Sequence, residues 1–367
     1  MKTTITRTIV ASIGLALAAA ACGGGSGGVT PSASQAAPSG TSGNAVFTVK
    51  IPHPAVSASS GDKRPAYLTP QVKGIDFSVS SSDGTLPSSR GYAFFALTPQ
   101  STYCTNGPSA LTCTLSVQAY PGNDSFAVAT YDQSNPTTLN PNNGQSHVIS
   151  VGYVTATIGA GATNAISITT SGIVSTVLIG LDKPYPAAGT PLTQNVHVTG
   201  VDADNNVIVG NFDSPLSLTD SDTSGVTTLS TTSIASSGAT ATMTYNGGTL
   251  GTVAFIKATT TSPVDYNNRG PFNAQTGFYP GSTSLWTAPQ YLTFGGVSSP
   301  AQTVTVNGTA SAWSSTSGCV GIVTISSTAP TYTVTPVAPG KCTMTLTYGT
   351  PPGAITSVSI PIVISPN

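Results

Sequence analysis

The stretch Gln194-Asn-Val-His-Val-Thr-Gly-Val-Asp-Ala-Asp-Asn-Asn-Val-Ile-Val209 decides the fold class of this 367-residue chain. From 194 to 201 apolar and polar side chains largely alternate, which is the pattern of a strand with one buried face. Residues 204–206, Asp-Asn-Asn, have the composition of a turn, and 207–209 are apolar again. The stretch is therefore predicted to form two short strands joined by an acidic turn.

Short strands of the same kind are predicted on both sides and divide the chain into three β-domains. Domain 2, residues 173–261, is predicted to have strands at 175–181, 194–201, 207–209, 216–218, 239–245 and 252–257. Domain 1, residues 44–172, is predicted to have them at 46–51, 74–79, 92–97, 111–117, 125–131, 147–157 and 164–170. A linker rich in Pro, Gly and Asn is predicted at 262–282. Domain 3, residues 283–367, is predicted to have strands at 290–294, 302–306, 321–325, 331–336, 342–348 and 358–364.

The composition also predicts an all-β chain. Charged residues make up 6% of the sequence, and the twelve acidic residues are all Asp. The helix formers Glu, Lys and Arg are thus absent or few, while the β-branched residues Thr and Val are abundant. The formal net charge is −1, which lacks the basic excess that neutralises phosphates, so nucleic acid is excluded as a partner.

Two segments resemble the immunoglobulin-like (Ig-like, Big-type) domains of bacterial surface proteins. In Val334-Thr-Pro-Val-Ala-Pro-Gly-Lys-Cys-Thr-Met-Thr-Leu346 a strand end is followed by Pro-Gly and an apolar strand. The stretch 198–209 is similar to the strand–acidic turn–strand hairpin of the same class. The resemblance implies tandem Ig-like β-sandwiches and covers domains 2 and 3 more fully than domain 1. The whole chain also resembles Ser/Thr/Gly-rich bacterial lipoproteins.

The N-terminus has the features of a secretory signal peptide, residues 1–21. Lys2 and Arg7 precede an apolar run, 9–21, which is shorter than the roughly 20 residues of a bilayer span. The small residues Ala19, Ala20 and Ala21 at the end of the run directly precede Cys22, an arrangement that resembles the lipobox of bacterial lipoproteins. The alternative is ordinary signal cleavage nearby, which leaves Cys22 as a free thiol.

The lipobox resemblance implies that Cys22 is lipidated and becomes the mature N-terminus. The chain is then expected in the cell envelope, with the membrane as partner through the lipid anchor. Gly23 after the cysteine implies the outer membrane or the cell surface in a host with two membranes. Residues 22–43, almost all Gly, Ser, Ala, Pro and Thr, are predicted to form a flexible tether.

Four further cysteines, Cys104, Cys113, Cys319 and Cys342, are an even number, as expected in an exported protein. They allow three pairings, and proximity in the sequence favours Cys104–Cys113 and Cys319–Cys342, each within one domain. Zinc ligation is the alternative, but the chain has no C-x-x-C spacing and no histidine near either pair. Each bridge is expected to stabilise the fold by about 2–4 kcal/mol.

No sequence motif identifies a catalytic residue. The three histidines, His53, His147 and His197, lie far apart in the sequence, and none belongs to a G-x-S-x-G, H-E-x-x-H or Walker motif. Most aspartates lie in turn-like stretches, where Asp bonds its own backbone. We therefore predict no catalytic residue, no cofactor and no enzyme activity.

One acidic pattern is typical of calcium loops. Asp202, Asp204 and Asn206 occupy alternate positions, so their oxygens can converge on a hard cation in a tight loop. Calcium bound in this way between domains would make the chain of sandwiches more rigid. Asp220 and Asp222 repeat the alternation. The pattern lacks the Gly and the bidentate Glu of an EF-hand loop. A pair of polar β-turns is the interpretation that we favour over calcium.

Both tryptophans, Trp286 and Trp313, lie in domain 3, with Tyr279 and Tyr291 nearby in the sequence. Exposed aromatic rings bind sugars through their flat apolar faces, whereas an Ig-like core commonly contains a tryptophan. The sequence thus predicts a non-enzymatic surface lipoprotein for adhesion, envelope structure or display, with a protein or glycan as possible ligand. A glycan- or envelope-polymer-binding lipoprotein is the alternative, and an exported hydrolase comes third.

Overall fold

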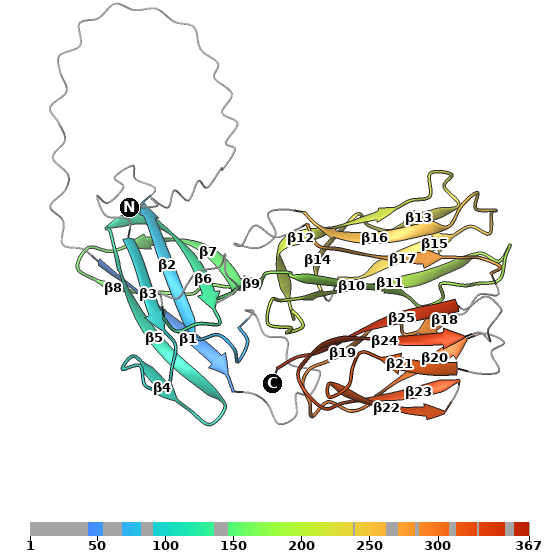
Figure 1. The fold of residues 1–367 in the computed structure, drawn as a ribbon. Coiled ribbons are helices and arrows are strands. Elements are labelled where there is room, and N and C mark those ends of the chain that lie inside the picture. The colour runs from blue at the N-terminus through green and yellow to red at the C-terminus, as the bar shows by residue number, and fades with distance from the viewer. Residues whose placement is uncertain are drawn as a thin grey trace, which may run out of the picture. The chain divides into compact units, whose positions relative to one another are not determined.

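A computed structural model describes residues 43–53, 68–81, 91–135, 146–237, 239–261, 271–282, 286–307, 313–328, 330–348 and 356–366. These residues form β-strands and turns without any α-helix, which confirms the predicted all-β class (Figure 1). Among them, no helix meets the length and apolar character that a membrane crossing requires. The three domains belong to one compact unit, Gly40–Asn367.

Domain 3 consists of two four-stranded sheets packed face to face. The first sheet has the order β18 (Trp286–Ala288), β20 (Gln302–Asn307), β23 (Thr331–Pro336), β22 (Val323–Thr328). The second has the order β19 (Leu292–Phe294), β25 (Thr356–Ile364), β24 (Gly340–Tyr348), β21 (Trp313–Ser317). When the strands are lettered A to G along the chain, with β18 as A and β19 as A′, the two sheets have the orders A-B-E-D and A′-G-F-C. This is the immunoglobulin arrangement. The sheets enclose a core that includes Phe294, Tyr332, Met344 and Ile360.

Domain 2 repeats this arrangement. One sheet has the order β10 (Thr176–Leu181), β11 (Leu192–Val201), β15 (Ala241–Tyr245), β13 (Thr227–Leu229). The other contains β17 (Asn273–Phe278), β16 (Ala254–Thr260) and β12 (Asn211–Asp220), and β14 (Ser233–Ser236) pairs with β12. Strand β17 occupies the G position and pairs with β16 from Ala254 to Thr259. It lies inside 262–282, so part of the segment predicted as a linker is the last strand of domain 2.

Domain 1 is also a sandwich of two sheets. One has the order β4 (Cys104–Asn106), β5 (Ala110–Ala119), β1 (Gly43–Pro52), β8 (Thr163–Ile166), and the other the order β3 (Gly91–Ala96), β2 (Gly74–Ser81), β6 (Gly122–Tyr131), β7 (Val148–Ile158). Strand β8 runs parallel to β1 and fills the position that strand A has in the other two domains. The rings of Phe47, Phe77 and Phe126 pack together in the core.

A three-residue strand, β9 (Thr170–Gly172), joins domains 1 and 2. It pairs antiparallel with β7, where Ser150 lies opposite Gly172, and it has a parallel bridge to Phe212 of β12. The G-F-C sheets of the two domains thereby become one nine-stranded sheet. The next residue, Ile173, is buried among Ala129, Val148 and Val151 of domain 1. The chain therefore passes from one domain to the next as a paired strand.

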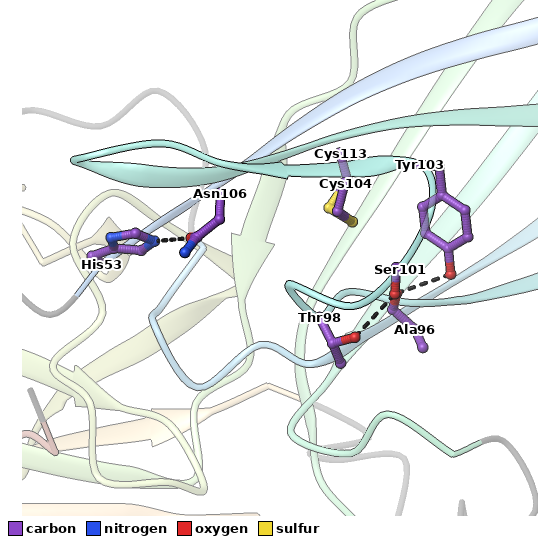
Figure 2. The surroundings of a disulfide bond; sticks show 8 residues. All are labelled: His53, Ala96, Thr98, Ser101, Tyr103, Cys104, Asn106 and Cys113. Atoms are coloured by element: carbon purple, nitrogen blue, oxygen red, sulfur yellow. Dashed lines mark hydrogen bonds between the residues drawn. A yellow bond between two sulfur atoms is a disulfide. The ribbon is translucent and has the colours of Figure 1, made fainter.

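Both disulfides favoured by sequence proximity are present in the structure. Cys104 lies directly opposite Cys113 in the β4–β5 pair and is bonded to it (Figure 2). Cys319, which follows β21, is bonded to Cys342 on β24. Cys319 and Cys113 are completely buried. Each bridge therefore lies within one domain.

Candidate functional site

The densest cluster of ligand-type side chains lies where domains 1 and 2 meet. Asp132 directly follows β6, and His147 directly precedes β7, so these two residues face each other at the base of one hairpin. Asp204 comes from the turn that follows β11 in domain 2. Two domains therefore supply one three-residue cluster.

His147 is the centre of this cluster. Its Nδ1 lies 3.0 Å from Asp132 Oδ2 and 3.1 Å from Asp204 Oδ1. The backbone N–H of His147 donates to the other carboxylate oxygen of Asp132 over 2.8 Å, which fixes the imidazole relative to that carboxylate. All three side chains are mostly buried, with 24%, 15% and 16% of the His147, Asp132 and Asp204 side chains exposed.

The two carboxylates favour the charged form of the imidazole. Hydrogen bonding to Asp132 and then to Asp204 raises the pKa of His147 to about 10, against the opposing effect of burial. The raised pKa favours a charged His147 at neutral pH, which faces Asp132 of its own domain and Asp204 of domain 2. One oxygen, Asp204 Oδ2, is buried without a hydrogen-bond partner among the described residues.

The turn that presents Asp204 is organised by its neighbours. Asp202 Oδ1 accepts hydrogen bonds from the backbone N–H groups of Asp204 and Asn206, over 2.9 and 2.8 Å. Asp202 Oδ2 accepts from the Asn206 side-chain amide over 2.9 Å, and Asn205 adopts a left-handed conformation with φ 67°. The predicted calcium set is therefore divided: Asp202 and Asn206 close the turn, and Asp204 reaches domain 1.

The second alternating pair forms a turn of the polar kind that the sequence favoured. Asp220 Oδ1 accepts from the N–H of Asp222 over 2.9 Å. Asp222 in turn accepts from the hydroxyl of Ser224 and the N–H of Thr227. Slight burial is outweighed by these hydrogen bonds, which lower the pKa of Asp222 to about 2. Both carboxylates therefore accept hydrogen bonds from backbone and hydroxyl groups of their own turn.

The other two histidines are in simpler surroundings. His53 Nε2 lies 2.9 Å from Oδ1 of Asn106, which belongs to the same strand, β4, as Cys104 (Figure 2). His197 lies on an exposed face of β11, with Nε2 2.6 Å from Asp182 Oδ1. Neither joins a group of three metal-binding side chains in the part of the chain that the structure describes.

Trp286 belongs to a stack of three aromatic rings. The Tyr185 ring lies 4.8 Å from the Tyr279 ring at 10°, and 6.3 Å from the Trp286 ring at 13°. All three residues are half-buried. Tyr279 lies over Gly277 of β17, where a Cβ would come within 2.4 Å of its ring, so a larger residue here would displace the ring. Tyr185 and Tyr279 belong to domain 2, and Trp286 is the first residue of β18 in domain 3.

The junction of domains 2 and 3 is otherwise made by neutral groups. Gln290 Oε1 accepts from the N–H of Leu181 and from the hydroxyl of Thr276, both over 2.8 Å. The hydroxyls of Thr199 and Tyr291 are 3.0 Å apart. Beside them, apolar side chains of the two domains form a small buried cluster, whose members are Leu178, Val201 and Val363 with Tyr291 packed against them.

Two predicted site residues are not placed. Cys22 and the predicted tether, apart from Gly43 at the start of β1, lie outside the described residues, as does the side chain of Trp313. In contrast, the sequence did not single out Asp132, His147 or Tyr185 as members of a site. For Asp132 and His147 a signal existed, because the two residues flank a polar loop between two predicted strands, where hairpin partners meet.

No protein-family model and no curated protein matches the sequence. Among solved structures, a chimeric titin Z1Z2 functionalized with an exogenous peptide from decorin matches 53% of this chain and 99% of its own, at 12% identity and a TM-score of 0.19. Surface layer protein SbsC, domains 4–9, matches 77% of this chain and 44% of its own, at 14% identity and a TM-score of 0.21. Invasin, a bacterial integrin-binding protein, matches 88% and 79%, at 14% identity and a TM-score of 0.18. The Ig-like assignment rests on the strand order of the three domains.

Proposed function

We propose that this chain is a non-enzymatic lipoprotein of the cell envelope that displays three tandem Ig-like domains for adhesion, structural or interaction roles. The observation that carries the proposal is the join between domains 1 and 2. Strand β9 pairs with β7 of one domain and bridges to β12 of the next, so the join is part of a sheet. A join of this kind fixes the orientation of two neighbouring domains, which suits a module that displays its domains away from a membrane.

The polar contacts support the same proposal. Each junction contains hydrogen bonds from one domain to the next, such as the one between His147 and Asp204 and the one from the Leu181 N–H to Gln290. Such contacts stabilise one arrangement of neighbouring domains. The two disulfides support an oxidising, extracytoplasmic location.

The lipid anchor is tested by mass spectrometry of the full chain, extracted from its native membrane without reduction. The proposal predicts a diacyl or triacyl adduct on Cys22 as the mature N-terminus. Export without an anchor would instead give an unmodified N-terminus beyond Cys22. Protease treatment of intact cells then tests display, because surface-exposed domains are cleaved without lysis and periplasmic ones are not.

Glycan binding is a second candidate, favoured by the stack of Tyr185, Tyr279 and Trp286. Three nearly parallel rings that each keep part of their surface exposed offer apolar area to the face of a sugar. Affinity electrophoresis in gels that contain soluble envelope polysaccharide tests this candidate. Retardation that is lost in Trp286→Ala, and retained in the exposed-site control Tyr153→Ala, supports it. Equal migration of all three proteins with and without polysaccharide contradicts it.

A further inference from the structure

We infer that Asp132, His147 and Asp204 bind one divalent cation of the zinc class at the junction of domains 1 and 2. This inference goes beyond the proposed function and is independent of the lipid anchor and of any surface ligand. It rests on the geometry of the donor atoms, on their charge, and on one buried oxygen without a partner.

The donor atoms are already close to the positions that a small cation requires. One imidazole nitrogen and two carboxylate oxygens lie within 4.8 Å of one another, and Nδ1 is 3.0 and 3.1 Å from the two oxygens. Ligands held at about 2.0–2.2 Å around a tetrahedral zinc ion are roughly 3.3 Å apart. The two nitrogen–oxygen separations therefore need to widen by only a few tenths of an ångström to admit the ion.

The charge of the cluster also favours a dication. Two carboxylates lie beside one imidazole nitrogen in a mostly buried place, and a dication balances the charge of the two carboxylates. Asp204 Oδ2, the buried oxygen without a hydrogen-bond partner among the described residues, gains a neighbouring positive charge when the ion binds.

The chemical types of the ligand atoms, one nitrogen and two oxygens, indicate which class of metal the site suits. Calcium takes six to eight oxygen ligands, and an imidazole nitrogen does not suit it. The carboxylate oxygens of Asp202, in the same turn as Asp204, are engaged by the backbone and side chain of that turn. A mixed set of one nitrogen and two carboxylates suits zinc and its first-row neighbours, with water completing the coordination.

Binding at this place would couple the two domains. Asp132 and His147 are fixed at the base of the β6–β7 hairpin, whereas Asp204 belongs to the β11–β12 turn. An ion that takes ligands from both sides binds the native junction and has no such site in the separated domains. Its binding therefore stabilises the docked arrangement by mass action.

The test uses the full-length chain in detergent, freed of metal with a chelator that is then removed by dialysis. Zinc chloride alone is titrated calorimetrically, and cobalt chloride is followed by its visible absorption. We expect one zinc ion per chain with a Kd in the micromolar range or tighter. His147→Gln and Asp204→Asn are expected to weaken binding at least tenfold. Calcium chloride at the same concentrations is expected to give no saturable heat.

His197→Gln is the matched control, because this exposed histidine contacts one carboxylate rather than two. It is expected to bind zinc as the native chain does. The inference is overturned if the native chain shows no saturable zinc binding, or if His147→Gln binds as tightly as the native chain. If a junction variant unfolds, the cobalt spectrum of the native chain decides: bands typical of nitrogen and oxygen ligation support the site, and the spectrum of hydrated cobalt contradicts it.

Discussion

The two domain junctions are built from different chemistry. Between domains 1 and 2 the chain continues as strand β9, and the polar contact is ionic, from His147, which also pairs with Asp132 of its own domain, to Asp204. Between domains 2 and 3 the described polar contacts are neutral, from Gln290 to Leu181 and Thr276. Each junction also contains buried apolar side chains.

This difference means that the two junctions are expected to differ in their response to pH and cations, although both are stabilised by apolar packing. Apolar packing contributes to both junctions in a way that pH does not change. Among the contacts of the described residues, charge acts at the first junction alone, so protons and cations are expected to alter that junction and leave the second one unaffected. The predictions below follow from this contrast, in order of decreasing effect.

The largest effect is expected from removing apolar side chains at the junctions. Ile173→Ala leaves a cavity among Ala129, Val148 and Val151, and Leu178→Ala leaves one beside Val363. Each is expected to lower the free energy of unfolding by about 2–5 kcal/mol, measured by denaturant titration. Val209→Ala, at a residue that is 51% exposed, is the control and is expected to stay within about 0.5 kcal/mol of the native chain. Equal effects of all three changes would show that the junctions are not packed.

A smaller effect is expected at the neutral junction. Gln290→Ala leaves the N–H of Leu181 and the hydroxyl of Thr276 without their acceptor. The expected loss is about 1–3 kcal/mol, and it should be the same at pH 6 and pH 9 because no titrating group takes part. Gln275→Ala, at an exposed residue of β17, is the matched control. A strong pH dependence of the Gln290 effect would contradict the contrast between the junctions.

The ionic junction is expected to weaken at high pH in metal-free protein. The pKa of His147 is raised to about 10 in the folded chain, from an ordinary value of 6.5. Its contribution is fully present below pH 6.5 and is lost as the pH rises through about 10. After allowance for screening of a partly exposed pair, we expect a loss of about 1–2 kcal/mol across this range. The measurement is the difference in unfolding free energy between the native chain and His147→Gln. A difference that does not vary from pH 6 to pH 10 would refute the ionic contact.

The smallest effect is expected at the exposed pair of His197 and Asp182. Hydrogen bonds from His197 and Asn195 outweigh slight burial and lower the pKa of Asp182. Because water screens this pair, His197→Gln is expected to change the free energy of unfolding by less than about 1 kcal/mol. Melting curves of the native and variant chains at low and high salt measure this. A loss as large as that of His147→Gln would remove the distinction between buried and exposed pairs.

Much of the strand pattern could be predicted from the sequence, because half-buried strands alternate apolar and polar residues. The expected strand at 46–51 lies within β1, and the one at 125–131 lies within β6. Strand β17 was missed, since Asn273-Ala-Gln-Thr-Gly-Phe278 has polar residues and a glycine where apolar ones are expected. The expected strand at 207–209 has one isolated bridge, Val201 to Val207, because β12 starts only at Asn211.

The candidate site was predictable in part. Alternation drew attention to the turn at 202–206, but it could not distinguish Asp202, which the backbone needs, from Asp204, which reaches another domain. The meeting of Asp204 with His147 depends on how β9 docks domain 2 against domain 1. Docking is a long-range result of packing, and no local spacing in the sequence encodes it.

The central claim is that β9 and Ile173 form a structural join between domains rather than a flexible linker. Native-state amide hydrogen exchange tests it most directly at the N–H of Ile173, which donates to the carbonyl of Ile149 over 3.0 Å. If the claim is right, this amide exchanges with a free energy of opening within about 1–2 kcal/mol of the global unfolding of domains 1 and 2. Exchange within seconds at neutral pH, while the amides of β6 and β7 stay protected, would contradict the claim.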